Sequence, residues 1–381
     1  MSESEVKYGL AGVIADDTAV SKVMPESNSL TYRGYAVQDL ATKCRFEEVA
    51  YLIWNKELPT KLQLEAINAA EKRERGLAPE MLKLIGMLNP KAHPMDTLRT
   101  AVSFMGQADD SANDSSPKGL YDKSLRMFAK IPEIVASDWR IRTGKKPIPS
   151  DKALGFSENF FHMCFGSVPA PEIVKCFDIS MTLYAEHSFN ASTYTARAVA
   201  SSLSDVYSAV TGAIGSLKGP LHGGANEAVM HLLKEVRTAK GAEGWMLDAL
   251  AKKKKNIMGF GHRVYKKGDS RVPTMTAAFK KMVEVIDTKE AREYWEISRI
   301  LDATMVREKN IYPNLDFPTG PAYYLMGFDI PIFTPIFVVS RITGWTAHVA
   351  EQLSANKLVR PLSNYTGVPQ RDVVPLEARK G

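Results

Sequence analysis

The spacing of apolar residues is typical of α-helices along most of the chain. In three segments, apolar residues recur three and four positions apart with polar residues between them. These stripes consist of Phe46, Val49, Ala50, Ile53 and Trp54; of Phe128, Ile131, Ile134 and Val135; and of Val229, Leu232, Leu233 and Val236. Alternation with a period of two, which a half-buried strand requires, is scarce. The sequence therefore predicts an all-α fold.

Local signals place several helix ends and loops. Thr60 and Gln63 have the spacing of a capping box, and Thr334 followed by Pro335 predicts an N-cap and a first helical position. Polar segments rich in turn-forming residues predict loops at 106–119 and 142–150. The polar stretch 366–381 is expected to form an arm that lies on a surface and does not pack as a helix.

Composition narrows the class of protein. The 381 residues allow two domains, and a hydrophobic content of 45% with 24% charged residues is ordinary for a globular chain. Cys44, Cys164 and Cys176 are unpaired in spacing, so we expect neither disulfides nor a structural metal. The net charge of +6 comes mostly from lysines and arginines interleaved with acidic residues, apart from the run Lys252–Lys255. Without a basic stripe that also carries aromatic residues, a nucleic-acid binder is disfavoured.

Targeting signals are not apparent in the sequence. The first residues, MSESEVKYG, have no apolar core or cleavage site of a signal peptide. The most apolar stretch, 330–339, contains Pro331 and Pro335 and is too short to span a bilayer. We therefore expect a cytoplasmic protein without a membrane partner.

Four short segments combine reactive side chains with glycine or turn-forming residues, as active sites often do. The first, at 218–226, surrounds His222 with glycines, and the second, at 259–271, places His262 between Gly261 and basic residues and ends at Arg271. The third carries Asp316 between Leu and Phe, where desolvation would raise its pKa and make it a better base. The fourth, at 185–193, carries His187.

Each of these residues also has a structural explanation. A histidine in a helix-capping turn, an aspartate as an N-cap, and an arginine in a surface salt bridge are all common. Arg271, Arg341 and Arg360 taken together with His187 would suit a dicarboxylate, because arginine binds carboxylates through two parallel hydrogen bonds.

Longer motifs are more specific. The segments GPLHGGANE, GFGHRVYKKGDSR, YPNLDFPTG, AEHSFNAST, SRITGWTAHVAEQ and VRPLSNYTG resemble the motifs of the citrate synthase family. LTYRGYAVQDLA and HPMDTLRTA, nearer the N-terminus, also resemble family segments. The resemblance runs from about residue 9 to about residue 367 in the family's order. It is to the short, dimeric citrate and 2-methylcitrate synthases.

This resemblance implies a large helical domain (1–224 and 328–381) and a smaller inserted helical domain (225–327), with the active site in the cleft between them. It also implies a homodimer in which Arg360 reaches the partner subunit's site, and a cleft that closes on oxaloacetate. The implied reaction joins an acyl-CoA to oxaloacetate, with water, to give citrate or 2-methylcitrate plus CoA. No metal and no tightly bound cofactor is implied; acyl-CoA is a co-substrate.

Site residues carried over from the family follow the motifs. Asp316 would remove a proton beside the thioester, His222 would stabilise the resulting enolate, and His262 would protonate the oxaloacetate carbonyl. The implied oxaloacetate ligands are His187, Arg271, Arg341 and Arg360. The implied CoA contacts are Lys252, Lys253, Lys254, Lys255, Asn256, Ile257, Met258, Gly259, Phe260 and Gly261. A charge run is usually a solvated face, so the four lysines could instead face solvent.

The sequence departs from the family pattern at Pro318, where an aromatic residue is common. We hypothesise that this change alters the room around the acyl group and the choice between acetyl- and propionyl-CoA. The leading interpretation is a citrate synthase; a 2-methylcitrate synthase or a bifunctional enzyme is the alternative. A non-catalytic helical scaffold is a remote alternative, which the presence of all three catalytic positions disfavours.

Overall fold

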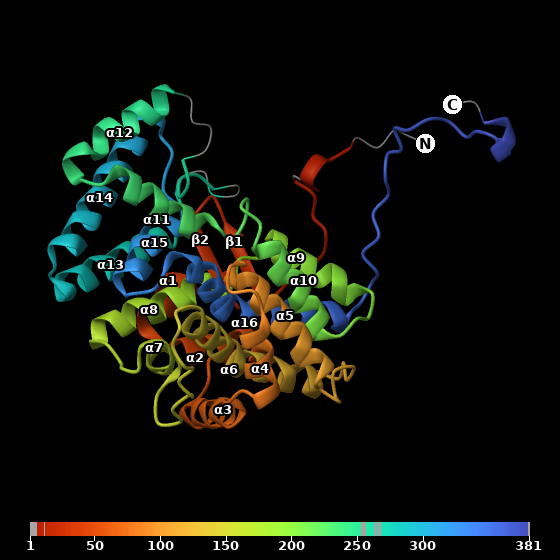
Figure 1. Cartoon of the computed structure of the whole chain (residues 1–381), viewed down its shortest axis with the longest axis horizontal. Coiled ribbons are helices and arrows are strands. Elements are labelled where there is room, and N and C mark those ends of the chain that lie inside the picture. Colours follow the sequence, from red (N-terminus) through yellow and green to blue (C-terminus); the bar gives the residue numbers. More distant parts are fainter. Residues whose placement is uncertain (1–5, 11, 253–256, 263–264, 266–267, 380–381) are drawn as a thin grey trace.

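The computed structural model describes residues 6–10, 12–252, 257–262, 265 and 268–379, and helices dominate these ranges (Figure 1). The helices of the first half are α1 (Val37–Lys43), α2 (Phe46–Asn55), α3 (Lys61–Glu74), α4 (Pro79–Met87), α5 (Pro94–Gln107), α6 (Pro117–Arg142), α7 (Phe156–Phe165) and α8 (Pro171–Tyr184). Those of the second half are α9 (Ala191–Ser201), α10 (Val206–Leu217), α11 (Ala225–Val236), α12 (Ala239–Ala251), α13 (Val272–Ile286), α14 (Lys289–Lys309), α15 (Asp316–Leu325) and α16 (Phe333–Ser354). The prediction of an all-α fold is confirmed.

The sequence patterns that predicted helices correspond to real packing. In α2 the residues Phe46, Val49, Ala50 and Ile53 are all buried. At the start of α3, Gln63 N–H donates to Thr60 Oγ1 at 3.3 Å and Thr60 N–H donates to Gln63 Oε1 at 2.9 Å, which is the expected capping box.

The longest apolar helix, α16, is the central helix of the fold. The segment Ile330–Ser354 is long and apolar enough to cross a membrane by length and composition, but 94% of its most apolar window is buried inside the protein. The expected N-cap at Thr334 is wrong, since a 3₁₀ turn (Ile330–Ile332) leads straight into α16 and the helix begins at Phe333. Thr334 N–H instead donates to Glu227 Oε1 at 3.2 Å, which ties α16 to α11.

A small antiparallel sheet near the N-terminus was not predicted. Its strands are β1 (Ser21–Met24), β2 (Ser29–Tyr32) and β3 (Tyr35–Ala36), in the order β1-β2-β3. Four residues are too few for a period of two to stand out in the sequence. The sheet matters for the site because Tyr32 Oη, at the end of β2, donates to the backbone carbonyl of Glu186 at 2.9 Å.

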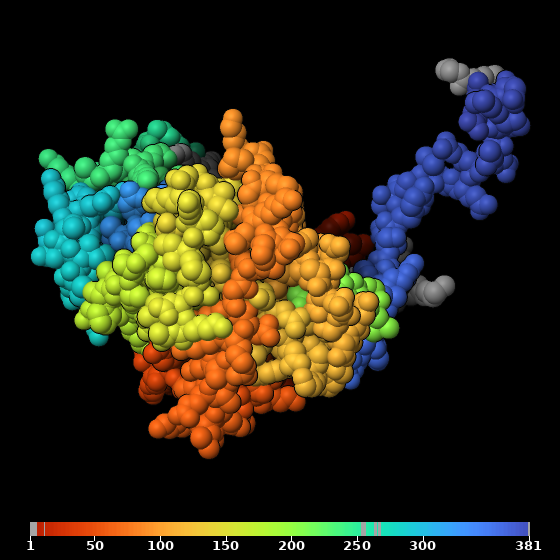
Figure 2. Space-filling model, turned by 60° about the horizontal axis from the view of Figure 1, so that its bottom comes forward, coloured from red at the N-terminus to blue at the C-terminus, as the bar shows by residue number. Residues whose placement is uncertain are grey.

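The helices form two groups, and the chain ends stand apart from both. Helices α11 to α15 gather at one end of the molecule, and the other helices form the larger remainder (Figure 1). After α16 the chain stays against α9 as far as Val359, whose N–H donates to Ser201 Oγ, and then runs away from the body as an extended arm (Figure 2). This arm carries exposed apolar side chains such as Leu362, which is 92% exposed. The expected arm is therefore present, but it does not lie on its own subunit's surface.

Candidate active site

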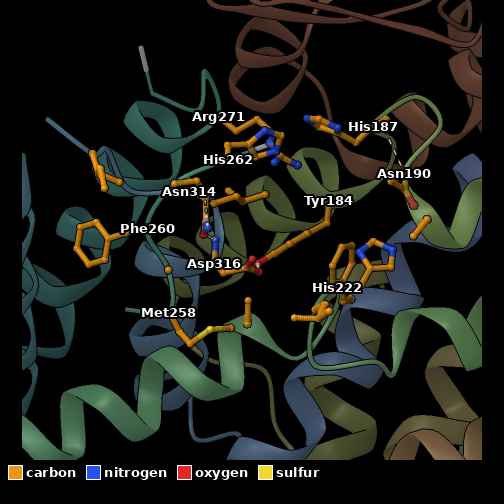
Figure 3. Close-up of a pocket in the computed structure, with 18 of the residues that line it drawn as sticks. Tyr184, His187, Asn190, His222, Met258, Phe260, His262, Arg271, Asn314 and Asp316 are labelled. Atoms are coloured by element: carbon orange, nitrogen blue, oxygen red, sulfur yellow. Dashed lines mark hydrogen bonds between the residues drawn. The ribbon is translucent and has the colours of Figure 1, made fainter. Parts of the chain in front are cut away.

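A cavity of about 1040 Å³ lies where α8, α15 and α16 meet the turn between α10 and α11. Its walls also include the segment 257–262 and the loop before α9 (Figure 3). Six of the residues predicted from the sequence line it together: His187, His222, His262, Arg271, Asp316 and Arg341. They come from segments far apart in the chain, so the fold itself assembles this set.

His222 lies in a turn that requires glycine at the following position, Gly223. A Cβ atom on Gly223 would lie 2.3 Å from the Leu217 carbonyl oxygen, so glycine is required there. Ser192 N–H donates to His222 Nε2 at 3.2 Å, which makes Nε2 an acceptor and leaves the proton on Nδ1. Burial, followed by the charge of Arg341, lowers the pKa of His222 to about 4. The ring is therefore neutral at pH 7 and carries one N–H.

His262 directly follows a segment that two glycines shape. Gly259 and Gly261 have φ values of 86° and 80°, and their backbone pairs with the stretch before α15. In that pairing, Gly261 N–H donates to the Tyr312 carbonyl at 2.8 Å and Asn314 N–H donates to the Gly259 carbonyl at 2.9 Å. Tyr265 N–H donates to His262 Nδ1 at 3.3 Å, so the proton resides on Nε2. Burial and then the charge of Arg271 lower the pKa of His262 to about 4.

His187 is the third histidine of the cavity. Its ring centroid is 5.1 Å from that of His262, and its Nε2 atom has no hydrogen-bond partner among the described residues. Burial, with the charges of Arg271 and His262 added, lowers the pKa of His187 well below its usual value. An unpaired polar atom at a cavity wall is costly unless a ligand satisfies it, so this nitrogen is a candidate ligand contact.

Asp316 is the first residue of α15 and faces Tyr184 (Figure 3). Tyr184 Oη donates to Asp316 Oδ1 at 2.6 Å. Burial raises the pKa of Asp316 to about 6, although the Tyr184 hydrogen bond opposes that shift. The alternative of a helix-capping aspartate fails, because Leu315 occupies the N-cap position of α15 and Asp316 is already helical.

Two buried arginines complete the cavity at the same end as His187. Arg271 Nε and Nη2 donate to the two carboxylate oxygens of Asp269 at 2.9 and 2.7 Å. Burial alone lowers the pKa of Arg271, but the charge of Asp269 outweighs it and raises the pKa above its ordinary value. Arg341 Nε donates to the Tyr184 carbonyl at 2.6 Å, while its Nη1 has no partner in the described part of the chain. Both side chains thus hold fixed positive charge at the wall.

The other predicted residues divide into some that line the cavity and some that do not. Arg360 is exposed on the C-terminal arm and does not line the cavity of its own subunit. Lys252 is also absent from the walls, and its Nζ pairs with Asp248 at 2.8 Å. Lys253, Lys254, Lys255 and Asn256 lie outside the described residues. Ile257, Met258, Gly259, Phe260 and Gly261 do line the cavity.

Several cavity residues were not predicted from the sequence, and three of them bear on the chemistry. Tyr184, Phe337 and Lys309 all line the walls. Tyr184 lies three positions before His187, which is the only signal that could have drawn attention to it. Lys309 ends a helix with mixed charges, and nothing in the sequence separates it from the other lysines. Within the described ranges, no group of three or more His, Cys, Asp or Glu side chains could hold a metal ion.

The fold and this set of groups define an all-α enzyme with a site for acid–base chemistry on an anionic substrate. The family model "Citrate synthase, C-terminal domain" matches residues 9–362. A citrate synthase of Mycolicibacterium smegmatis is 54% identical over 98% of this chain and 99% of its own length. A 2-methylcitrate synthase of Mycobacterium tuberculosis (strain H37Rv) is also 54% identical, over 96% of this chain and 92% of its own.

Solved structures agree with these relatives. The ternary complex of citrate synthase from Thermoplasma acidophilum with carboxymethyl coenzyme A and oxaloacetate superimposes with a TM-score of 0.89 at 30% identity. The match covers 98% of this chain and all of the other. The chain belongs to the citrate synthase family.

Proposed function

We propose that His222, His262 and Asp316 carry out the reaction of this family. The protein is a transferase that condenses an acyl-CoA with oxaloacetate and takes acyl-CoA as a co-substrate. One observation carries the assignment of the three residues: they converge on a single cavity with protonation states that suit a base and two neutral hydrogen-bond donors.

Proton removal is the first chemical step. With a pKa near 6, Asp316 is largely ionised at pH 7 yet basic enough to accept a proton from the carbon beside the thioester. His222, with its proton on Nδ1, can donate a hydrogen bond to the thioester oxygen as negative charge develops there. Because the ring is neutral, it stabilises the enolate without first protonating it.

Carbon–carbon bond formation is the second step. The enolate carbon attacks the ketone carbon of oxaloacetate, and the ketone oxygen takes the proton that His262 holds on Nε2. The proton that Asp316 removed from the acyl carbon then replaces it on His262 through solvent, so both groups return to their starting states. Arg271, Arg341 and the unpaired Nε2 of His187 surround the place where the substrate's charges and carbonyl would lie. Water then cleaves the thioester and releases CoA.

The structure supports most of the described CoA contacts that were expected, but not Lys252. The segment 257–261 supports the expected contacts because it lines the cavity. Lys252 does not line it, whereas Lys309, at the end of α14, does. We therefore assign the cation at this end to Lys309, where it would face the anionic part of CoA.

We propose the domain boundaries that the resemblance implies, with residues 225–327 as the smaller domain. Helices α11 to α15 fall within the segment 225–327 and lie together at one end of the molecule (Figure 1). The cavity has walls from both groups of helices, so a relative rotation of the groups would open and close it. We also propose a cytoplasmic location, and the burial of α16 inside the protein is compatible with it.

The homodimer is supported by the exposed C-terminal arm. An extended segment with apolar side chains such as Leu362 and Leu376 needs a surface to cover it, and its own subunit provides none (Figure 2). A second copy of the chain would bury the arm and could bring Arg360 to the partner's cavity.

Subunit mixing tests this arrangement. Asp316→Asn and Arg360→Ala homodimers are each expected to be nearly inactive. A mixed dimer would contain one site with an intact Asp316 and an intact Arg360 donated by the other chain, so activity should return on mixing. Failure to recover activity in verified mixed dimers would place Arg360 in its own subunit's site or outside any site.

The two candidate functions differ in the acyl substrate. The leading function is citrate synthase, which uses acetyl-CoA; the alternative is 2-methylcitrate synthase, which uses propionyl-CoA, or an enzyme with both activities. Pro318 is buried in α15 and is not among the residues that line the cavity, so the hypothesis that it shapes the acyl pocket directly loses its support. Tyr184 and Phe337, whose ring centroids are 4.2 Å apart, form the wall beside Asp316. One methylene changes binding by only about 1–3 kcal/mol, so both acyl-CoAs are expected to react.

Product analysis decides between the two activities. CoA release would be followed with a thiol reagent for acetyl-CoA and propionyl-CoA, and the tricarboxylate products would be identified by mass. A higher kcat/KM with acetyl-CoA supports the citrate synthase; a higher value with propionyl-CoA supports the alternative.

A further inference from the structure

Directly before His187 in sequence lies a carboxylate that the reaction does not use. The Glu186 side chain is completely buried, as is that of His348, and Glu186 Oε1 lies 2.9 Å from His348 Nε2. Ser21 Oγ also donates to Oε1, at 2.9 Å. Glu186 Oε2 has no hydrogen-bond partner in the described part of the structure. Burying a carboxylate with one unpaired oxygen costs free energy, so we expect the Glu186–His348 pair to have a role that offsets this cost.

A chain of charged groups connects this pair to the protein surface. His348 Nδ1 lies 3.3 Å from Arg197 Nη1, which donates to Glu351 Oε2 at 2.8 Å. Arg197 Nη2 donates to Asp16 Oδ2 at 2.7 Å, and Asp16 is half exposed on the N-terminal segment. The ring of His348 is therefore held from both sides, and it holds Glu186 in turn.

On its other side, Glu186 fixes the backbone that carries His187. Ser21 Oγ, which donates to Glu186, also accepts from Ser188 N–H at 2.9 Å. Ser188 has a φ of 51°, a conformation that is unfavourable for a residue with a Cβ atom and persists only where the surroundings enforce it. The Glu186 carbonyl accepts from Tyr32 Oη at 2.9 Å. These contacts hold the backbone on both sides of His187.

The charge of Glu186 also bears on Arg341. Burial by itself raises the pKa of Glu186, but the charge and hydrogen bond of His348, together with the charge of Arg341, bring the pKa below its ordinary value. Glu186 is thus an anion behind the cavity wall. Arg341 is buried, and one of its terminal nitrogens is unpaired at the cavity. Glu186 supplies a counter-charge that this guanidinium otherwise lacks.

We propose that Glu186, anchored by His348 and Ser21, is a positioning residue that aims His187 and Arg341 at oxaloacetate. The proposal rests on the oxaloacetate-binding roles proposed above for His187 and Arg341. It concerns oxaloacetate only, because His187 and Arg341 are the two residues that Glu186 would position; Glu186 itself is not among the residues that line the cavity.

The test compares the two substrates in one series of variants. Glu186→Gln keeps the shape of the side chain and removes its charge; we expect the KM for oxaloacetate to rise about tenfold and the KM for acyl-CoA to stay within twofold. Calorimetric titration with oxaloacetate alone should give the same loss of affinity. The matched control is Glu71→Gln, which breaks another buried ion pair (Glu71–Arg75, 2.8 Å) in α3 and should leave both KM values unchanged.

A smaller change keeps the proposal testable if Glu186→Gln does not fold. Ser21→Ala removes only the hydroxyl that links Glu186 to Ser188 N–H, and about a threefold rise in the oxaloacetate KM is expected. If Glu186→Gln does not fold, this variant decides. An unchanged or lower oxaloacetate KM in the folded variants, or an equal rise for both substrates, overturns the proposal.

The variant His187→Ala distinguishes a failure of the positioning role of Glu186 from a failure of the proposed oxaloacetate site. If His187→Ala leaves oxaloacetate affinity unchanged, the proposed oxaloacetate site is wrong and Glu186 has no such role. If His187→Ala weakens binding and neither Glu186→Gln nor Ser21→Ala does, only the positioning role falls.

Discussion

The two ends of the cavity are built differently. At the end assigned to oxaloacetate, Arg271 and Arg341 are buried, and each donates a hydrogen bond of 2.9 Å or less to a fixed acceptor. At the end assigned to CoA, the segment 257–261 supplies apolar side chains and backbone, and Lys309 is exposed. Asp316 lies between the two ends (Figure 3).

This difference follows from what each substrate requires. A small dicarboxylate offers few atoms, so its binding and polarisation depend on a few charged groups held in advance. A large nucleotide thioester can gain affinity from many weak contacts, none of which has to be rigid. Single substitutions should therefore have large effects at the first end and small effects at the second.

The largest effect is expected at the boundary between the ends. Asp316→Asn removes the only carboxylate in the cavity walls of the described structure, and kcat should fall by about 10³-fold. Affinity for oxaloacetate, measured by calorimetry, should change little. A variant with near-normal kcat would show that another group removes the proton.

At the oxaloacetate end, Arg341→Lys keeps the charge and loses the planar donor. Arg341 Nε would no longer donate to the Tyr184 carbonyl, and the KM for oxaloacetate should rise about 10- to 100-fold. Steady-state kinetics with each substrate varied in turn measure the change. An equal rise in the acyl-CoA KM would contradict a division of the cavity into two ends.

The pH dependence of kcat tests whether Tyr184 lowers the pKa of Asp316. Since the pKa of Asp316 is about 6, activity should fall as the pH drops through 6, whereas His222 and His262, with pKa values of about 4, stay neutral there. Tyr184→Phe removes a hydrogen bond that favours the ionised carboxylate, so the pKa rises and the acid limb should move to higher pH. An unmoved limb would assign it to a different group.

The smallest effect is expected at the CoA end. Lys309→Ala should raise the KM for acyl-CoA about threefold, because one exposed charge contributes little. Lys252→Ala, the matched control, should leave it unchanged, since Lys252 pairs with Asp248 away from the cavity. The reverse result would return the CoA contact to Lys252.

The sequence predicted the parts of the molecule that local pattern determines. The stripe in α2, the capping box at Thr60 and the histidine turns are signals within a few residues, and the structure contains them. The strands β1 to β3 were too short to show a period, and the start of α16 was shifted by a preceding 3₁₀ turn.

Contacts between distant segments could not be predicted in this way. Tyr184 and Asp316 are 132 positions apart, and their hydrogen bond exists because the end of α8 meets the start of α15. The resemblance pointed to the run Lys252–Lys255, of which only Lys252 lies among the described residues. Lys252 does not line the cavity, whereas Lys309 does, because α14 ends beside it. The Glu186–His348 pair spans 162 positions and has no local signature.

The most direct measurement is CoA release by the purified protein from acetyl-CoA and from propionyl-CoA, with and without oxaloacetate. We expect rapid release that requires oxaloacetate and disappears in Asp316→Asn. Release that is independent of oxaloacetate, or no release with either acyl-CoA from a folded dimer, would contradict it.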